Sequence, residues 1–221
     1  MTVVFWGVDL ARSKVAVARL PLPESGVLFL QAASVPREYR EAEVARACQL
    51  AGTVREALRA VGTDDVLAIE SPWSSRMGSD LETGMVFGQC LRVIFGELSG
   101  RVFFVAPATL KCFTTGNGKD PKSRMALCAY KQWGFEARLR GDAQEDEVDA
   151  YCLAQMARCL VEPEDFHGYQ REALERAFQS SGKRHNPECL VRPQCPPDAP
   201  TATRTRRERK GGGQAQLEGV E

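Results

Sequence analysis

The sequence predicts a single α/β domain with a five-stranded mixed sheet that is flanked by helices. Short apolar segments rich in β-branched and aromatic residues recur along the chain, which is typical of strands. Longer segments with apolar residues at helical spacing separate the later strands, so these strands are expected to run parallel. A chain of 221 residues is also long enough to bury a sizeable core.

The predicted strands form an antiparallel meander of three, followed by two strands that are each reached through a helix. Gly26 is expected at the turn between the second and third strands, and Gly100 precedes the fifth. The five predicted strands cover residues 3–8, 14–20, 27–34, 66–70 and 101–105.

Two long helices are expected between these strands. The first covers residues 41–61, with Gly62 as its C-terminal stop. The second covers residues 81–98 and is apolar around much of its circumference, so we expect it to be buried on more than one side, as in a dimer interface. Pro107 is expected to open a short helix.

Two carboxylates end predicted strands. Asp9 follows the first apolar run and Glu70 ends the run VLAIE. Such apolar runs fit central parallel strands, whose carboxyl ends form the usual site of an open α/β sheet. Either acid alone could be a solvated turn residue, but together they are expected to face one cleft.

Two further carboxylates begin a helix near Ala143. Asp142 is expected to be its N-cap and Glu145 to complete a capping box. Asp146 and Asp149 are three residues apart, so they share a helical face. The same face continues as an apolar stripe that could dock on the sheet, formed by Ala150, Leu153, Ala154 and Ala157.

A cluster of four acids predicts bound cations. Carboxylates that lie close together repel one another and raise each other's pKa unless cations neutralise them. Oxygen ligands without His or Cys favour Mg²⁺ or Mn²⁺ over zinc. Glu145 and Glu147 are interpreted as bystanders, and the eight cysteines contain no C-x-x-C pair that would predict zinc.

Five segments, in this order, resemble the RuvC family of Holliday-junction resolvases in the ribonuclease-H-like superfamily. They are GVDLARSKVAVA, LAIESPW, FGQC, TTGNGKDPKS and DEVDAYCLA, and the resemblance covers about residues 3–160. It implies a ribonuclease-H-like fold and a Mg²⁺-dependent homodimer that cuts four-way DNA junctions symmetrically. It also implies two Mg²⁺ per active site, replaceable by Mn²⁺, and four catalytic and metal-binding acids, Asp9, Glu70, Asp146 and Asp149.

The resemblance extends to DNA-contacting positions. Lys111 and Lys122 stand about the G-x-G turn as the family's lysines do, and Trp73 stands where the family places an aromatic that stacks on an opened base. The alternative for Trp73 is a partly buried loop aromatic. Further basic candidates for DNA contact are Arg76, Lys119 and Arg124.

The chemistry of phosphodiester hydrolysis accommodates these residues. Two metals about 3.5–4 Å apart can activate water, compensate phosphate charge and stabilise the leaving oxygen. Our hypothesis is that Asp9 bridges both metals, Glu70 holds one, and Asp146 and Asp149 hold the other. Lys122 would compensate charge on the scissile phosphate and so act in catalysis.

Charge is distributed unevenly, although Lys plus Arg and Asp plus Glu both number 29. Residues 101–140 hold eight basic and two acidic residues, an excess of six that suits a phosphate backbone. Residues 182–221 hold eight basic and five acidic residues, an excess of three that is concentrated in RTRRERK. This tail could raise DNA affinity, contact a partner, or have no specific role.

The predicted organisation is a nuclease domain over 1–160, a helical extension over 161–181 and a disordered Pro/Gly/Arg-rich tail over 182–221. No apolar run of 18 residues and no signal peptide is present, so we expect no membrane partner. The expected location is the cytoplasm of a bacterial cell or a phage-infected host.

Several alternatives to a junction resolvase remain open. One is a branched-DNA nuclease of broader specificity, and another is a module that binds branched DNA without cutting it. A third is an ATP-handling relative of actin and the sugar kinases, which needs phosphate loops. The GNGK segment does not match a P-loop, because Phe113 stands where Gly is required and Asp120 where Ser or Thr is required.

Overall fold

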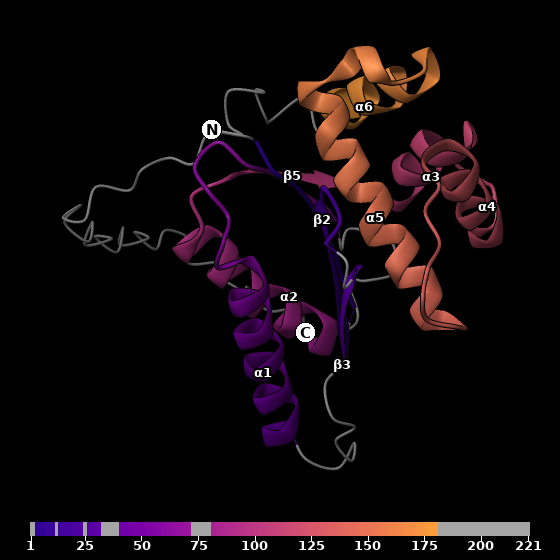
Figure 1. Ribbon diagram of the computed structural model, residues 1–221. Coiled ribbons are helices and arrows are strands. Elements are labelled where there is room, and N and C mark those ends of the chain that lie inside the picture. Colours follow the sequence, from indigo (N-terminus) through magenta and orange to yellow (C-terminus); the bar gives the residue numbers. More distant parts are fainter. Residues whose placement is uncertain (1–2, 12, 24–25, 32–39, 72–80, 181–221) are drawn as a thin grey trace, which may run out of the picture.

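The fold is given by a computed structural model that describes residues 3–11, 13–23, 26–31, 40–71 and 81–180. A mixed sheet forms its centre, with strand order β3-β2-β1-β4-β5 (Figure 1). Strands β1, β2 and β3 pair antiparallel, whereas β4 lies parallel to β1 and to β5. The strands are β1 Phe5–Leu10, β2 Lys14–Leu20, β3 Leu28–Gln31, β4 Val66–Glu70 and β5 Arg101–Val105.

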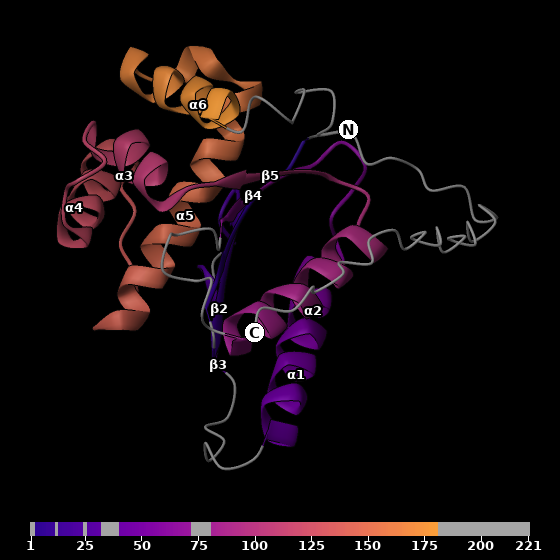
Figure 2. The same ribbon diagram turned by 180° about the vertical axis from the view of Figure 1, so that it is seen from behind.

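Helices cover both faces of the sheet. Helices α1 and α2 pack side by side on one face, and α5 crosses the other face with α3, α4 and α6 beyond it (Figures 1 and 2). The helices are α1 Arg40–Leu58, α2 Leu81–Glu97, α3 Pro107–Thr115, α4 Lys122–Trp133, α5 Asp142–Val161 and α6 Gly168–Ser180, with a 3-10 turn η2 at Pro163–Asp165. The predicted α/β class is therefore confirmed.

Alternation along the strands divides the core into two layers. Successive side chains of a strand point to opposite faces of the sheet. Val8 of β1 packs in the layer that contains the apolar faces of α1 and α2, whereas Phe5 packs in the layer built around α5. Strand β2 follows the same rule, with Val15 and Val17 on the first side and Ala16 on the second.

Helix α5 lies unusually close to the sheet where it crosses Gly7. A Cβ atom at Gly7 would overlap the carbonyl oxygen of Ala150 and lie 2.8 Å from the Cβ of Leu153. Only glycine leaves room for the helix backbone at this point. The apolar stripe predicted for this helix does dock on the sheet, since Ala150, Leu153, Ala154 and Ala157 are all buried.

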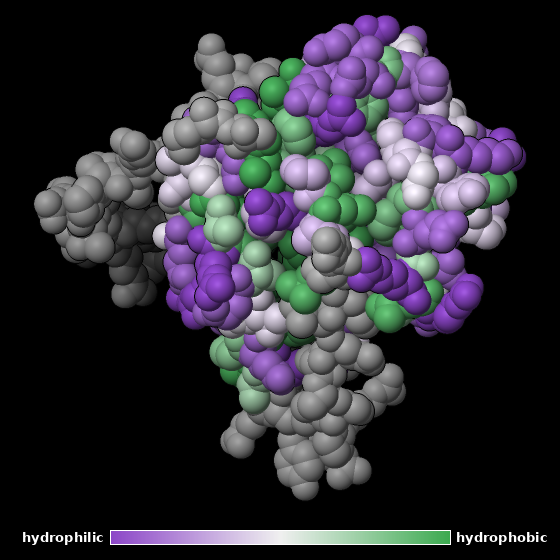
Figure 3. All heavy atoms as spheres, in the orientation of Figure 1, coloured by the Kyte–Doolittle hydropathy of each residue, from purple (hydrophilic) through white to green (hydrophobic). Residues whose placement is uncertain are grey.

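The outer surface is more polar than these two layers. In the space-filling view the region over α6 is mostly hydrophilic, and apolar atoms appear in smaller patches (Figure 3). Exposed large apolar side chains do occur on α2 and α4, namely Phe95, Leu127 and Tyr130. Within the described residues, no helix combines the length and apolar character needed to cross a membrane.

Several sequence-based boundaries need correction. Strand β1 extends to Leu10, so Asp9 lies inside the strand rather than after it. Helix α1 ends at Leu58, and the Gly62 amide instead donates to the Asp65 carboxylate at 2.9 Å. Helix α4 was not predicted, because it buries only Met125 and Ala129.

The capping box predicted for α5 is wrong. Asp142 is the first residue of the helix, and the N-cap is Gly141, at φ 64°. Within the described part of the chain no side chain caps this terminus. Glu145 instead lies 3.6 Å from the ammonium of Lys122.

Some predictions concern residues outside the described ranges. They include the DNA-contacting candidates Trp73 and Arg76, the basic tail over 182–221, and the end of the third strand after residue 31. These remain predictions.

Gly7→Ala tests the close approach of α5 to the sheet. We expect it to lower the free energy of unfolding by about 2 kcal/mol or more, because α5 or β1 must shift. The matched control is Gly52→Ala in α1, where no described atom lies within 4 Å of an added Cβ. That change should stabilise by roughly 0.5–1 kcal/mol. Equal urea unfolding curves for wild type and Gly7→Ala would contradict the packing described here.

Candidate metal centre

Two acids of the site come from neighbouring parallel strands. Val8 of β1 lies in register with Ile69 of β4, so Asp9 and Glu70 each follow a paired position. Both lie on the α5 side of the sheet, because Gly7 meets α5 and Ala68 packs in that layer two residues before Glu70. The shared face of the two strands therefore brings their carboxylates together, as the sequence predicted.

Helix α5 supplies the third acid of the cluster. Oxygen atoms of Asp9, Glu70 and Asp149 all lie within 4.8 Å of one another. Asp9 is 8% exposed and Asp149 only 4%, so these carboxylates are enclosed by protein. The separation of α5 from β1, fixed at Gly7, sets how far Asp149 reaches toward the strands.

Asp146 does not join this group of three among the described residues. Its Oδ2 atom forms an ion pair with the ammonium of Lys14, at the start of β2. Asp146 remains close enough to act on Asp9 electrostatically. The sequence therefore placed Asp146 on the correct face of α5 but missed its partner, Lys14.

Lys122 provides a positive charge within the cluster. It is the first residue of α4, and its ammonium lies 3.0 Å from Oδ2 of Asp149 and 3.6 Å from Oε2 of Glu145. Its pKa is raised because the attraction of Asp149 outweighs the opposing effect of burial. Lys122 therefore lies at the edge of the acidic cluster.

Burial and mutual repulsion raise the pKa values of the clustered acids. The pKa of Asp9 is well above its ordinary value, first through burial and then through the charges of Glu70 and Asp149. Burial, followed by the charges of Asp149 and Asp146, raises the pKa of Glu70 from 4.5 to about 7. The pKa of Asp149 is also raised, by burial, although Lys122 opposes the shift.

These properties fit a hard divalent cation. Three carboxylates offer oxygen ligands at mutual distances that one ion can satisfy, and their pKa values are raised by burial and then by mutual repulsion. A bound cation would relieve that repulsion. The described part of the site offers no His or Cys, so its donor atoms suit Mg²⁺ or Mn²⁺.

The predicted DNA-contacting lysines and arginine lie on or near α3 and α4. Lys111 of α3 lowers the pKa of Glu70 by its charge, so it lies within electrostatic range of the site. Lys119 is exposed in the following turn, where its amide donates to Asn117 at 3.1 Å. Arg124 pairs with Asp120 at 3.0 Å, so part of the predicted positive excess is compensated locally.

The turn before α4 is tightly built. Gly116 ends α3 at φ 85°, and its amide donates to the carbonyl of Cys112 at 2.9 Å. A Cβ at Gly118 would lie 2.8 Å from the carbonyl oxygen of Ala108. These glycines fix the path of the chain between Lys111 and Lys122.

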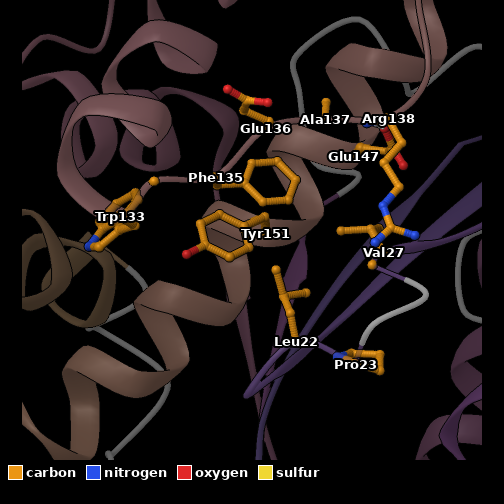
Figure 4. A pocket seen from close by; sticks show the side chains of 12 residues that line it. Leu22, Pro23, Val27, Trp133, Phe135, Glu136, Ala137, Arg138, Glu147 and Tyr151 are labelled. Carbon is orange, nitrogen blue, oxygen red and sulfur yellow. Dashed lines mark hydrogen bonds between the residues drawn. The ribbon is translucent and has the colours of Figure 1, made fainter.

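A cavity of about 650 Å³ (Figure 4) has none of Asp9, Glu70 and Asp149 among its lining residues. It is lined by Phe135 and Tyr151, whose rings stack at 4.0 Å, and by Glu147. Glu147 is only 2% exposed and accepts the amides of Arg138 and Leu139, each at 2.9 Å. It therefore holds the segment before α5, a structural role that the sequence did not indicate.

The strand order, with helices on both faces of the mixed sheet, forms an α/β fold of the ribonuclease-H-like type. This fold is similar to that of two solved RuvC structures. The Thermus thermophilus RuvC structure matches with a TM-score of 0.51 and 16% identity, covering 81% of this chain and 96% of its own. T. thermophilus RuvC in complex with a Holliday junction substrate matches with a TM-score of 0.52 and 17% identity, covering 75% and 98%.

The yeast mitochondrial Holliday junction resolvase Ydc2 also matches, with a TM-score of 0.46, 12% identity and coverage of 77% of this chain and 83% of its own. This likeness is too weak to bear on the fold. No protein-family model and no curated protein sequence matches the chain. The two RuvC structures confirm the fold that the sequence resemblance implied.

The shifted pKa of Glu70 predicts how the metal-free protein responds to pH. Between its ordinary pKa of 4.5 and its folded value of about 7, the folded state keeps a proton that the unfolded chain has lost. Stability must therefore fall as pH rises through this window. We expect the thermal midpoint in EDTA to fall by roughly 5 °C between about pH 5 and pH 8.

Glu70→Gln isolates this contribution, because other groups also titrate. It should flatten the fall in thermal midpoint, whereas Glu56→Gln on the exposed surface of α1 should leave it unchanged. Mg²⁺ should raise the wild-type midpoint more at high pH than at low pH, since protons compete with the ion. Identical pH slopes for wild type and Glu70→Gln would contradict the raised pKa assigned to Glu70.

Proposed function

We propose that this protein is a metal-dependent DNA endonuclease that resolves four-way junctions by symmetric phosphodiester hydrolysis. The observation that carries the proposal is the convergence of Asp9, Glu70 and Asp149 within 4.8 Å, in a fold shared with RuvC. The RuvC structure in complex with a Holliday junction substrate supports the choice of substrate. The order of sequence motifs supports the same family.

The chain's own residues suggest how such a site works. Asp9, Glu70 and Asp149 would hold the first ion, and Asp146, which lies outside this group, would contribute to a second. This allocation replaces the one expected from the sequence, in which Asp149 shared an ion with Asp146, because Asp149 groups with Asp9 and Glu70. When bound, paired divalent ions activate water and stabilise the leaving oxygen. Lys122 keeps its positive charge beside Asp149 and would orient and neutralise the scissile phosphate.

The walls of the site restrict the motion of these groups. Asp9 lies inside a strand that pairs with β2 on one side and β4 on the other. Asp149 lies in a helix that packs against the same strand. Rigid placement of the carboxylates reduces the reorganisation needed when charge develops on the phosphate.

A homodimer would present two such sites to the two symmetry-related strands of a junction. Helix α2 offers a suitable surface. Phe95 is 46% exposed, and added Cβ atoms at Gly84, Gly88 and Gly96 would meet no described atom within 4 Å. Glycines along an exposed face allow close approach of a partner helix, so we propose that α2 pairs with its symmetry mate.

Cleavage of a labelled four-way junction tests the proposed activity. Wild type should make paired, symmetric nicks with Mg²⁺ or Mn²⁺, and EDTA should abolish them. Asp149→Asn should reduce the rate by about a thousandfold or more while junction binding persists, because a carboxylate ligand is lost. Linear duplex and flap substrates serve as controls.

Junction binding without cutting under every metal condition would exclude the nuclease and favour a binding module. Equal cutting of flaps and junctions would instead indicate a branched-DNA nuclease of broader specificity. An Asp149→Asn variant with a normal rate would contradict the assignment of this acid.

Light scattering of Gly88→Glu tests the proposed dimer surface. We expect wild type to have the mass of a dimer and Gly88→Glu that of a monomer, because the new side chain places charge and volume in the α2 contact. Gly52→Glu on α1 is the matched control, since an added Cβ at Gly52 also meets no described atom within 4 Å. A dimeric Gly88→Glu would exclude this face of α2 as the interface.

A further inference from the structure

Lys14 is a residue of the site to which the proposed reaction assigns no role. Its ammonium pairs with Oδ2 of Asp146, and the two side chains are 23% and 10% exposed. This oxygen is buried and has no hydrogen-bond partner among the described residues. The ion pair with Lys14 is therefore its compensating interaction.

The position of Lys14 is set by the sheet. Ala16 and Ala18 of β2 pack in the α5 layer, so alternation directs Lys14 to the same face. The carbonyl of Lys14 accepts the amide of Ala11 at 2.9 Å, and Lys14 lies in register with Gln31 of β3. The lysine is thus held in the sheet on both sides rather than carried by a loose surface loop.

Lys14 and Lys122 each form an ion pair with a different aspartate of α5. Lys122 pairs with Asp149, which still lies within the group of three, whereas Lys14 pairs with Asp146, which lies outside it. A cation that used Asp146 would compete with Lys14 for the same buried oxygen. Such competition costs metal affinity, because the ammonium must leave and be solvated again.

We propose that Lys14 is a built-in counter-ion that holds Asp146 away from metal, so that the DNA-free protein takes up one divalent ion per subunit tightly and a second only weakly. The inference rests on the proposed metal-dependent function and adds a residue that controls metal loading. The first ion binds at Asp9, Glu70 and Asp149. The second position fills once Lys14 leaves Asp146.

Counting bound Mn²⁺ tests this role without measuring activity. The full chain without DNA is titrated with Mn²⁺, and free ion is followed by its EPR signal. Wild type should bind one ion tightly, and Lys14→Met should bind a second about tenfold more tightly than wild type does, because its competitor is gone. Lys14→Arg should behave as wild type, since it keeps the charge.

Lys111→Met is the matched control for a general change in charge. Lys111 also acts on the cluster, through Glu70, but no ion pair joins it to Asp146. A purely long-range effect would make Lys111→Met and Lys14→Met equivalent. Equal effects of the two substitutions, or no effect of Lys14→Met, would overturn the proposal.

Asp146→Asn gives an independent test that does not require Lys14→Met to fold. Both substitutions are compared by the affinity for the first Mn²⁺ ion. The loss of affinity in Asp149→Asn should be about ten times the loss in Asp146→Asn or more, because Asp146 is paired with Lys14. Equal losses would overturn the proposal. If Asp9→Asn binds Mn²⁺ as wild type does, the metal site itself is wrong and the proposed function fails as well.

Discussion

The close packing of helix α5 on strand β1 is the constraint on which the rest of the structure depends. The crossing occurs at Gly7, where any Cβ would overlap the backbone of the helix. This contact brings the first turns of α5 to the strand end that carries Asp9. The same contact lets Asp149 reach Asp9 and Glu70, so the geometry of the acidic cluster follows from the packing of the core. Gly7 thereby determines how the carboxylate of Asp9, two residues later, is placed relative to Asp149.

Electrostatic strain in the acidic cluster is the second consequence of this packing. Burial and like charges raise the pKa values of Asp9 and Glu70, and the positive charge of Lys122 opposes both shifts only in part. Lys122 forms an ion pair with Asp149, and Lys14 forms one with Asp146. At the proposed metal site, protons, ammonium groups and divalent ions would compete for these carboxylates. The proposed metal binding, the pH and the lysine ammonium groups would therefore be linked through the same few oxygen atoms.

Much of the fold and the site could be predicted from local sequence patterns. The acids that follow predicted strands identified Asp9 and Glu70 as site residues. Helical spacing predicted that Asp149 lies on the sheet-facing side of α5. The partner of Asp146 could not be predicted, because it depends on the register of β2 against β1 and on the depth at which α5 packs. Alternation in β2 was the available signal for Lys14. The predicted capping box was wrong because Gly141, with its positive φ, is the N-cap. The helix therefore begins at Asp142, one residue earlier than predicted.

The most direct test of the account is a crystal structure of the protein with Mn²⁺, using anomalous scattering to locate the ion. We predict a peak enclosed by carboxylate oxygens of Asp9, Glu70 and Asp149, at about 2.0–2.3 Å from them. Lys14 should still contact Asp146 when only this peak is present. A crystal that holds Mn²⁺ elsewhere, with these three carboxylates free of it, would contradict the assignment of the metal centre.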